Sequence, residues 1–252
     1  MIILLYQKDN YLDKSITYLV SKEIFEYDIS SAGFNLCRLY KLLSEDTLNR
    51  LECLPKHERH IQIGLMCRKD QNLNENLKKA FIDIRKWFFE ANNLTDNDIL
   101  SIKKDAIFVY KRCDNTVNEN LVFNMKNHYT SYYRINKKEL YVGNHLDIKG
   151  ISDEKLELHK EYMVSFLYNI FKAIEQSSRT YVIREIKSFA DYYKAKELEF
   201  GYYRELNETS LFRCNYKFIG ESLGLDVVDN LDMVNIAYNY MNYIVPLIEI
   251  LI

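Results

Sequence analysis

Glycine and proline are scarce in this sequence: its 252 residues include only 7 Gly and 2 Pro. Because these residues interrupt helices and strands, their scarcity leaves little room for long irregular segments. The chain is 48% hydrophobic and 28% charged. It can therefore bury a substantial core, and its composition is that of a globular protein rather than a disordered one.

Cysteine is present but shows no pattern. None of the five cysteines belongs to a Cys-x-x-Cys pair, and an odd count cannot be fully paired. This favours free, buried thiols in a reducing compartment over a disulfide framework or a zinc site. The five are Cys37, Cys53, Cys67, Cys113 and Cys214.

Long apolar runs are also missing. The run at residues 1–6 stops at Gln7, and the run at residues 243–252 is interrupted by Pro246 and Glu249. Neither reaches the roughly 20 apolar residues needed to span a bilayer. The sequence therefore predicts a cytoplasmic protein with no membrane partner.

Several common catalytic motifs do not occur. The sequence has no glycine-rich phosphate loop, no Rossmann fingerprint, no Gly-x-Ser-x-Gly and no His-Glu-x-x-His. ATPase, dehydrogenase and hydrolase functions thus have no support. A net charge of -2 also argues against polyanion binding over the whole surface, so nucleic-acid contact would require a local basic patch.

A predicted hairpin at residues 98–110 is the most informative stretch. Residues 99–102 and 106–110 are rich in β-branched and aromatic side chains, and the charged residues 103–105 form a tight connection between them. Asp105 is thereby placed at the hairpin tip.

A second aspartate, Asp28, lies near the end of a predicted strand at residues 24–29. If this strand lies beside the hairpin, Asp28 and Asp105 meet at one edge of the sheet. Two carboxylates on rigid strands provide oxygen ligands for Mg²⁺ (or Mn²⁺), with substrate phosphates completing the shell. The pair is the predicted catalytic and metal site.

These residues resemble motifs of family-B DNA polymerases. Residues 27–31 (Tyr-Asp-Ile-Ser-Ser) are similar to the first palm motif, and residues 103–109 are similar to the third, with its second Asp at Asp105. Residues 125–129 resemble the Lys-x-x-Tyr element, and residues 148–151 resemble the Lys-Gly segment that leads into the thumb. Each motif is short, but their order and rough spacing agree. The resemblance implies a divergent palm and thumb core, of a kind carried by phages or mobile elements.

The sequence departs from that family at three points. Lys103 stands where the third motif has its first Asp, and Gly33 stands where the first motif has its sugar-sensing Tyr. No Asn-Ser-x-Tyr-Gly occurs between the two motifs. These departures bear on both activity and sugar selectivity.

A helix is predicted over residues 72–93 from apolar residues at helical spacing, capped by Asn72 or Asn74. In the resembled family, a helix in this position presents Lys and Arg to the incoming triphosphate. The matching candidates for nucleotide binding are Lys78, Lys79 and Arg85. The alternative is an ordinary solvated face opposite an apolar stripe.

The stretch from residue 103 to residue 138 carries eight basic residues against three acidic ones, with tyrosines between them. Basic groups can neutralise phosphates while aromatic rings pack on bases or sugars. The candidate nucleic-acid contacts are Lys126, Tyr129 and Arg134, together with Lys149 from the Lys-Gly segment. Against this, tyrosines are ordinary half-buried residues of strands.

The cluster at residues 56–60 precedes a strand-like segment at residues 61–64. His57 and His60 could contact a metal, but no third ligand is nearby. Lys56 and Arg59 could instead form a basic loop near a phosphate, or the cluster could be a solvated turn. A helix is predicted over residues 11–23 from apolar residues on one face.

The fold class predicted from these elements is α+β: an antiparallel, palm-like sheet with packed helices, followed by a mainly helical part. The proposed domains are a palm-like region at residues 1–150 and a helical, thumb-like region at residues 151–252. The second includes a predicted helix that is capped by Ser152 or Asp153 and has inward-facing residues as far as Ile174, and further predicted helices at residues 179–200 and 230–243. A helical scaffold packed on a sheet, without a polymerase relationship, is the neutral interpretation.

Three functions remain open from the sequence. The favoured one is a nucleotidyltransferase of DNA replication, a DNA-polymerase-like core that acts on primed nucleic acid and a nucleoside triphosphate by a two-metal mechanism. Such a short core could need a second polymerase subunit for fingers or proofreading. The alternatives are a non-catalytic, nucleic-acid-binding accessory subunit with a palm-like fold, and an interaction protein without a nucleic-acid role.

Overall fold

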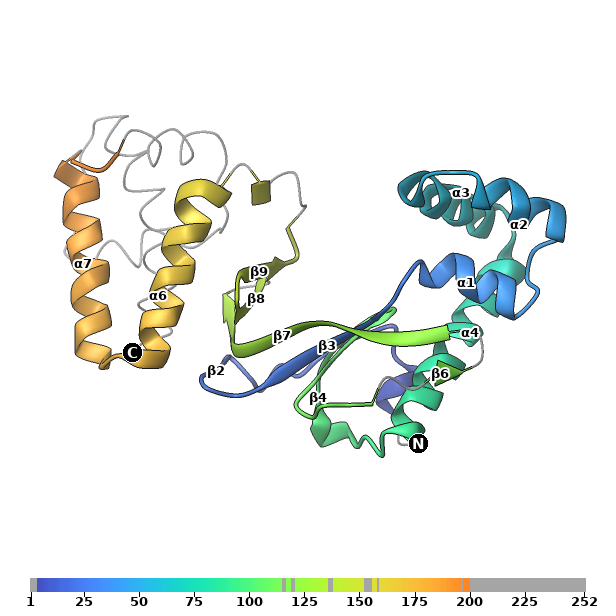
Figure 1. Ribbon diagram of the computed structural model, residues 1–252, viewed down its shortest axis with the longest axis horizontal. Coiled ribbons are helices and arrows are strands. Elements are labelled where there is room, and N and C mark those ends of the chain that lie inside the picture. The colour runs from blue at the N-terminus through green and yellow to red at the C-terminus, as the bar shows by residue number, and fades with distance from the viewer. Residues whose placement is uncertain are drawn as a thin grey trace. The chain divides into compact units, whose positions relative to one another are not determined.

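A computed structural model describes residues 4–114, 117–118, 121–135, 138–151, 156–157, 159–195 and 197–199 (Figure 1). The protein is α+β, and every strand pairing with a described register is antiparallel. The α-helices are α1 (Ala32–Leu39), α2 (Glu45–Glu52), α3 (Lys56–Lys69), α4 (Gln71–Ala91), α6 (Ser165–Gln176) and α7 (Arg179–Ala195). Short helical turns are η1 (Leu5–Gln7), η2 (Asp96–Asp98) and the π-helical η3 (Lys160–Val164). The strands are β1 (Asn10–Leu12), β2 (Tyr18–Leu19), β3 (Ile24–Ile29), β4 (Ile99–Lys103), β5 (Ala106–Val109), β6 (Val117–Asn118), β7 (Leu121–Ile135), β8 (Lys138–Gly143) and β9 (Leu146–Lys149).

The chain divides into two compact units. Unit 1 comprises residues 1–14 and 23–128, and unit 2 comprises residues 15–22 and 129–252. The long strand β7 contributes its first part to unit 1 and its second part to unit 2. The predicted boundary at residue 150 falls inside unit 2.

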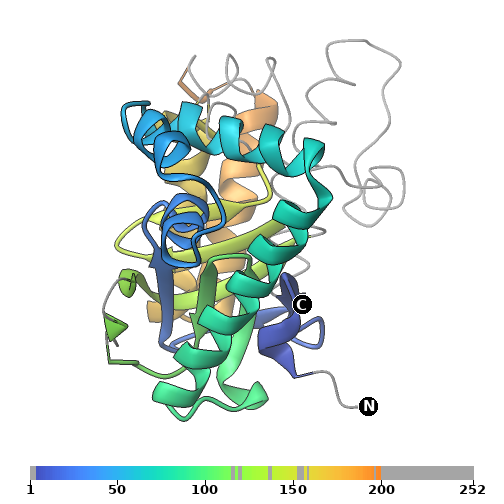
Figure 2. The same ribbon diagram turned by 90° about the vertical axis from the view of Figure 1, so that its right-hand side faces the viewer.

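In unit 1, the strand order is β1-β4-β5-β3-β7. The hairpin β4–β5 pairs Lys103 with Ala106 across its turn, and β5 pairs in turn with β3. The helix α4 crosses one face of these strands (Figure 2). Tyr27 of β3 and Phe123 of β7 both contact Phe88 of α4, with ring centroids 5.3 and 4.4 Å from it. One core therefore joins the sheet to the helix.

The helix α4 forms for the reasons that the sequence predicts. Its apolar residues recur every three or four positions and are buried against the sheet. The carboxylate of Asp70 caps its first turn, accepting hydrogen bonds from the backbone N–H groups of Asn72 (2.9 Å) and Leu73 (3.1 Å). The cap is thus Asp70 rather than the predicted Asn72 or Asn74.

In unit 2, β7 pairs with β8, β8 pairs with β9, and β2 pairs with β7. Figure 1 shows α6 and α7 side by side. The ring of Phe171 on α6 stacks on Tyr133 of β7 with a centroid separation of 4.2 Å. Buried tyrosines from the strands supply much of this core; they are Tyr129, Tyr132, Tyr133 and Tyr141.

Two predicted elements are wrong. Residues 10–12 and 18–19 form strands, whereas a helix was predicted over residues 11–23. Residues 61–64 are part of the helix α3, whereas a strand was predicted. In each case a short apolar pattern fits both periodicities, and packing with distant segments decides between them. The helix predicted at residues 230–243 lies outside the described residues.

Among the helices of the described residues, none is both long enough and apolar enough to cross a membrane.

Candidate active site

The structure places Asp28 and Asp105 beside each other in unit 1. Asp28 lies on β3 opposite Ala106 of β5, and Asp105 directly precedes Ala106 in the β4–β5 turn. Burial raises the pKa of the Asp105 carboxyl, and the neighbouring negative charge of Asp28 raises it further. The two predicted carboxylates are therefore close enough for the charge of Asp28 to affect the protonation of Asp105.

The turn that carries Asp105 has an unusual backbone. Lys104 adopts φ 54°, in the left-handed region that non-glycine residues seldom enter. Its backbone N–H donates to the carbonyl oxygen of Asp9 at 2.7 Å. The turn is thus held by the segment before β1 as well as by its own hairpin.

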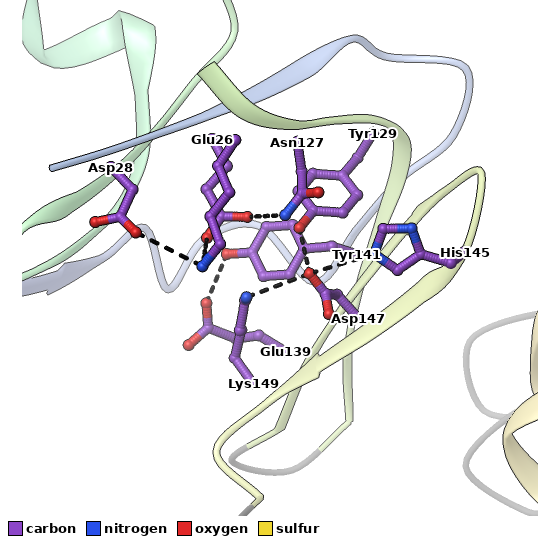
Figure 3. A network of polar contacts seen from close by, with 10 residues as sticks. Glu26, Asp28, Asn127, Tyr129, Glu139, Tyr141, His145, Asp147 and Lys149 are labelled. Atoms are coloured by element: carbon purple, nitrogen blue, oxygen red, sulfur yellow. Dashed lines mark hydrogen bonds and ion pairs between the residues drawn. The ribbon is translucent and has the colours of Figure 1, made fainter. Parts of the chain in front are cut away.

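A buried glutamate lies on the same strand as Asp28, two residues earlier. The side chain of Glu26 is only 2% exposed and accepts a hydrogen bond from Nδ2 of Asn127 at 2.7 Å (Figure 3). The ammonium of Lys126 lies 3.9 Å from Oε1 of Glu26 and 3.6 Å from Oδ2 of Asp28. Lys126, predicted as a nucleic-acid contact, therefore lies beside both carboxylates, and its side chain is still 53% exposed.

Asp105 also lines a pocket of about 540 Å³ within unit 1. The other walls come from the start of α1, from α3 and from α4. The polar and charged lining residues are Asp9, His60, Arg68, Gln71, Asn74, Lys78, Lys104 and Asp105. Most of the cationic side chains come from the helices, whereas Asp105 comes from the sheet.

The start of α1 adds a further feature that favours anions. Ala32 and Gly33 line the pocket at the first turn of this helix, which follows Ser31 at φ 50°. Backbone N–H groups at a helix N-terminus, together with the helix dipole, attract negative charge. A Cβ added at Gly33 would meet no atom within 4 Å. The pocket could accept a polyanion such as a triphosphate between this turn and the basic helices.

The three predicted nucleotide contacts have different positions. Lys78 lines the pocket, whereas Lys79 is exposed on α4 outside the lining. Arg85 is fully buried, and its donors are directed at Tyr6, Asp9 and Lys104. Of the three, only Lys78 is placed to contact a ligand in the pocket.

The other predicted nucleic-acid contacts lie in unit 2. Tyr129 is fully buried and its hydroxyl donates to Asp147 at 2.5 Å, so its ring is not presented to a base (Figure 3). The ammonium of Lys149 also donates to Asp147, at 3.3 Å. Arg134 is partly exposed on β7, and its backbone N–H donates to the carbonyl oxygen of Thr17. Tyr129 and Lys149 therefore belong to a network around Asp147.

The basic cluster at residues 56–60 forms the start of α3. The guanidinium of Arg59 donates to the carbonyl oxygens of Leu51 and Leu54, each at 3.1 Å, and so closes the end of α2. His60 lines the pocket; burial lowers its pKa, and Lys56, Arg59 and His57 lower it further. Arg59 thus has a structural role, and His60 remains beside the pocket.

Among the polar pocket residues, Asp9, Arg68, Gln71 and Asn74 were not predicted as ligand contacts, and His60 was considered only as a metal ligand. The signal for the helical ones was spacing, since the lining positions 60, 63, 64, 67 and 68 share a face of α3, and the lining positions 71, 74, 77, 78 and 81 share a face of α4. The strand assigned to residues 61–64 concealed the face of α3.

Within the described part of the chain, no cluster of three or more His, Cys, Asp or Glu side chains could hold a metal ion. A pair of carboxylates is nevertheless a suitable donor set for Mg²⁺, which commonly takes one or two carboxylates and fills its shell with phosphate oxygens and water. Asp28 and Asp105 are neighbours that could provide such a pair to an ion with a phosphate ligand.

The family model of the bacteriophage PBS1 gene 130 protein matches residues 1–252. The chain belongs to this family. No curated protein matches the sequence.

Proposed function

We propose that this member of the PBS1 gene 130 family is a polymerase-like core that performs template-directed nucleotidyl transfer at Asp28 and Asp105. The observation that carries the proposal is the pairing of these two carboxylates beside a pocket with a basic wall. The strand order also supports it, because the hairpin with Asp105 lies directly beside the strand with Asp28.

In this proposal, the pocket holds a nucleoside triphosphate. Arg68 and Lys78 bind the phosphate oxygens, and the first turn of α1 adds backbone donors. Asp28 and Asp105 would hold Mg²⁺ (or Mn²⁺), which would activate a primer hydroxyl for attack and neutralise the charge of the pyrophosphate that leaves. The chain's own contribution is to position the triphosphate in the pocket and to hold Asp28 next to the pocket residue Asp105.

Asp105 must lose its proton to act as a ligand. Burial and the charge of Asp28 raise the pKa of Asp105, so in the free site this carboxyl keeps its proton to a higher pH than an exposed aspartate does. A cation that binds Asp105 must displace this proton. The affinity of the site for a divalent ion should therefore increase as the pH rises through the pKa of Asp105.

The non-catalytic accessory subunit is a second candidate, favoured by one specific observation. Lys103 stands where the third motif of the resembled family has its first Asp. Such a chain would bind primed nucleic acid for a separate catalytic subunit.

A primer-extension assay with Mg²⁺ or Mn²⁺ tests the proposal. Wild type should extend a primer, and Asp105→Asn should abolish extension because the amide keeps the shape but removes the charge that holds the cation. Asp83→Asn is the matched control, since Asp83 is exposed on α4. Binding of primed template without extension by wild type would replace the catalytic proposal with the accessory one.

A further inference from the structure

Arg85 is the largest fully buried side chain of the described residues. Its Nε donates to the carbonyl oxygen of Tyr6 at 2.8 Å, and its Nη1 donates to the carbonyl oxygen of Lys104 at 2.8 Å. Its Nη2 donates to Oδ1 of Asp9 at 3.0 Å. One side chain of α4 therefore binds both the N-terminal segment and the turn of the β4–β5 hairpin.

These contacts close a ring around Lys104. The backbone N–H of Lys104 donates to the carbonyl oxygen of Asp9, and its own carbonyl oxygen accepts from Arg85. Arg85 in turn holds the side chain of Asp9. Both polar backbone groups of Lys104 are therefore held from outside the hairpin.

Lys104 needs such support because of its conformation. At φ 54° it lies in the left-handed region, which is unfavourable for a lysine. A conformation of this kind persists only where surrounding contacts hold it. The next residue is Asp105, so the direction of its carboxylate depends on the backbone of Lys104.

Simple packing would not require a guanidinium at this position. Burial lowers the pKa of Arg85, which reflects the cost of desolvating its charge, and Asp9 and Asp105 favour the charged form. An arginine presents several donors in a fixed planar arrangement, whereas lysine has one ammonium group. The three contacts use that arrangement.

We infer that Arg85 is a positioning residue: it fixes Lys104 in the left-handed conformation and thereby directs Asp105 toward Asp28. The part of this inference that concerns cation binding rests on the proposed function. Arg85 itself contacts no phosphate, and its effect on the site is transmitted through the backbone of Lys104.

Hydrogen exchange and Mn²⁺ binding together test the inference in the full chain. In Arg85→Lys, we expect the amide of Lys104 to exchange about tenfold faster and the dissociation constant for Mn²⁺, measured by electron paramagnetic resonance, to rise about tenfold, as loss of one or two such hydrogen bonds implies. Arg59→Lys is the matched control, because Arg59 also donates to backbone carbonyls but at the end of α2. It should change neither quantity.

A second substitution identifies the route of the effect. Asparagine adopts the left-handed region more readily than lysine, so Lys104→Asn should lessen the dependence of the turn on Arg85. We expect Arg85→Lys to weaken Mn²⁺ binding less than threefold in the Lys104→Asn background, a coupling typical of contacting residues. Equal losses in both backgrounds would show that Arg85 does not act through Lys104.

Asp9→Asn keeps the test decisive if Arg85→Lys does not fold, because it weakens the ring while leaving the guanidinium in place. It should accelerate exchange at Lys104 by a smaller factor. Unchanged exchange at Lys104 in the folded variants would overturn the inference. Faster exchange confined to the hairpin, in a protein whose wild type binds no Mn²⁺, would retain the positioning role of Arg85 and reject the proposed function.

Discussion

Replacement of Tyr27 by phenylalanine tests how β3 is fixed beside the hairpin. The hydroxyl of Tyr27 donates to the carbonyl oxygen of Cys113 at 2.8 Å and accepts from the N–H of Cys113 at 2.7 Å. Tyr27 is completely buried, and Cys113 is 6% exposed. Tyr27→Phe keeps the ring against Phe88 but removes both hydrogen bonds.

The expected loss of stability follows from these two contacts. A net contribution of about 0.5–1.5 kcal/mol per hydrogen bond gives a lower range of about 1–3 kcal/mol. Each buried group that loses its partner costs about 1–3 kcal/mol, although a small shift of the Cys113 segment would let water reach it. We therefore expect Tyr27→Phe to lower the free energy of unfolding by about 2–4 kcal/mol.

Urea unfolding followed by tryptophan fluorescence measures this change. The chain has one tryptophan, Trp87, which packs against the core of unit 1 and so reports on the unit that contains Tyr27. Tyr40→Phe is the matched control, because Tyr40 lies in the same unit and is 38% exposed. It should change the free energy of unfolding by less than about 0.5 kcal/mol.

A loss below about 0.5 kcal/mol for Tyr27→Phe, similar to that of the control, would refute the reasoning. It would mean that Cys113 does not depend on the Tyr27 hydroxyl. The hydrogen bonds between Tyr27 and Cys113 would then contribute little to the placement of β3 and of Asp28.

Three further predictions concern the site. Because the folded-state pKa of Asp105 is raised, the folded protein binds more protons than the unfolded chain above about pH 4, and the contribution of Asp105 to stability falls as pH rises. In urea titrations at pH 4–7, Asp105→Asn should remove this fall and be more stable than wild type at pH 7. Parallel pH profiles for the two proteins would contradict the raised pKa of Asp105. Charge reversal at Lys126 and Arg134 should weaken binding to primed template and flatten its salt dependence, as measured by fluorescence anisotropy at several salt concentrations; unchanged binding by both variants would favour the interaction-protein alternative. Gly33→Ala should stabilise the helix α1 by about 0.5–1 kcal/mol, because alanine favours a helix over glycine and no atom lies within 4 Å of the new Cβ. Gly64→Ala should stabilise α3 by a similar amount for the same reason. A lower melting temperature for either variant would show that the space beside the glycine must stay open.

Local sequence pattern determined the central elements of unit 1. Two β-branched and aromatic runs around residues 103–105 define the hairpin of β4 and β5, and the repeat at Leu73, Leu77 and Ile84 defines α4. These patterns are strong because the apolar side chains named in each stretch follow a single periodicity, that of a strand or that of a helix. They placed Asp28 and Asp105 at strand ends, whereas the meeting of the two aspartates depended on β3 lying beside the hairpin, which only the pairing of β3 with β5 provides.

Tertiary structure decided which polar residues belong to the site. In the sequence, Arg85 and Lys78 are both basic residues of the helix α4, and nothing distinguishes their roles. In the folded chain, Arg85 is buried by contacts with residues far away in the sequence, which are Tyr6, Asp9 and Lys104. Likewise, the stripe of α3 that begins at His60 became a pocket wall only by facing the turn of Asp105. A helical period gives the direction of a side chain around its own axis, whereas its partners come from segments that only the folded chain brings together.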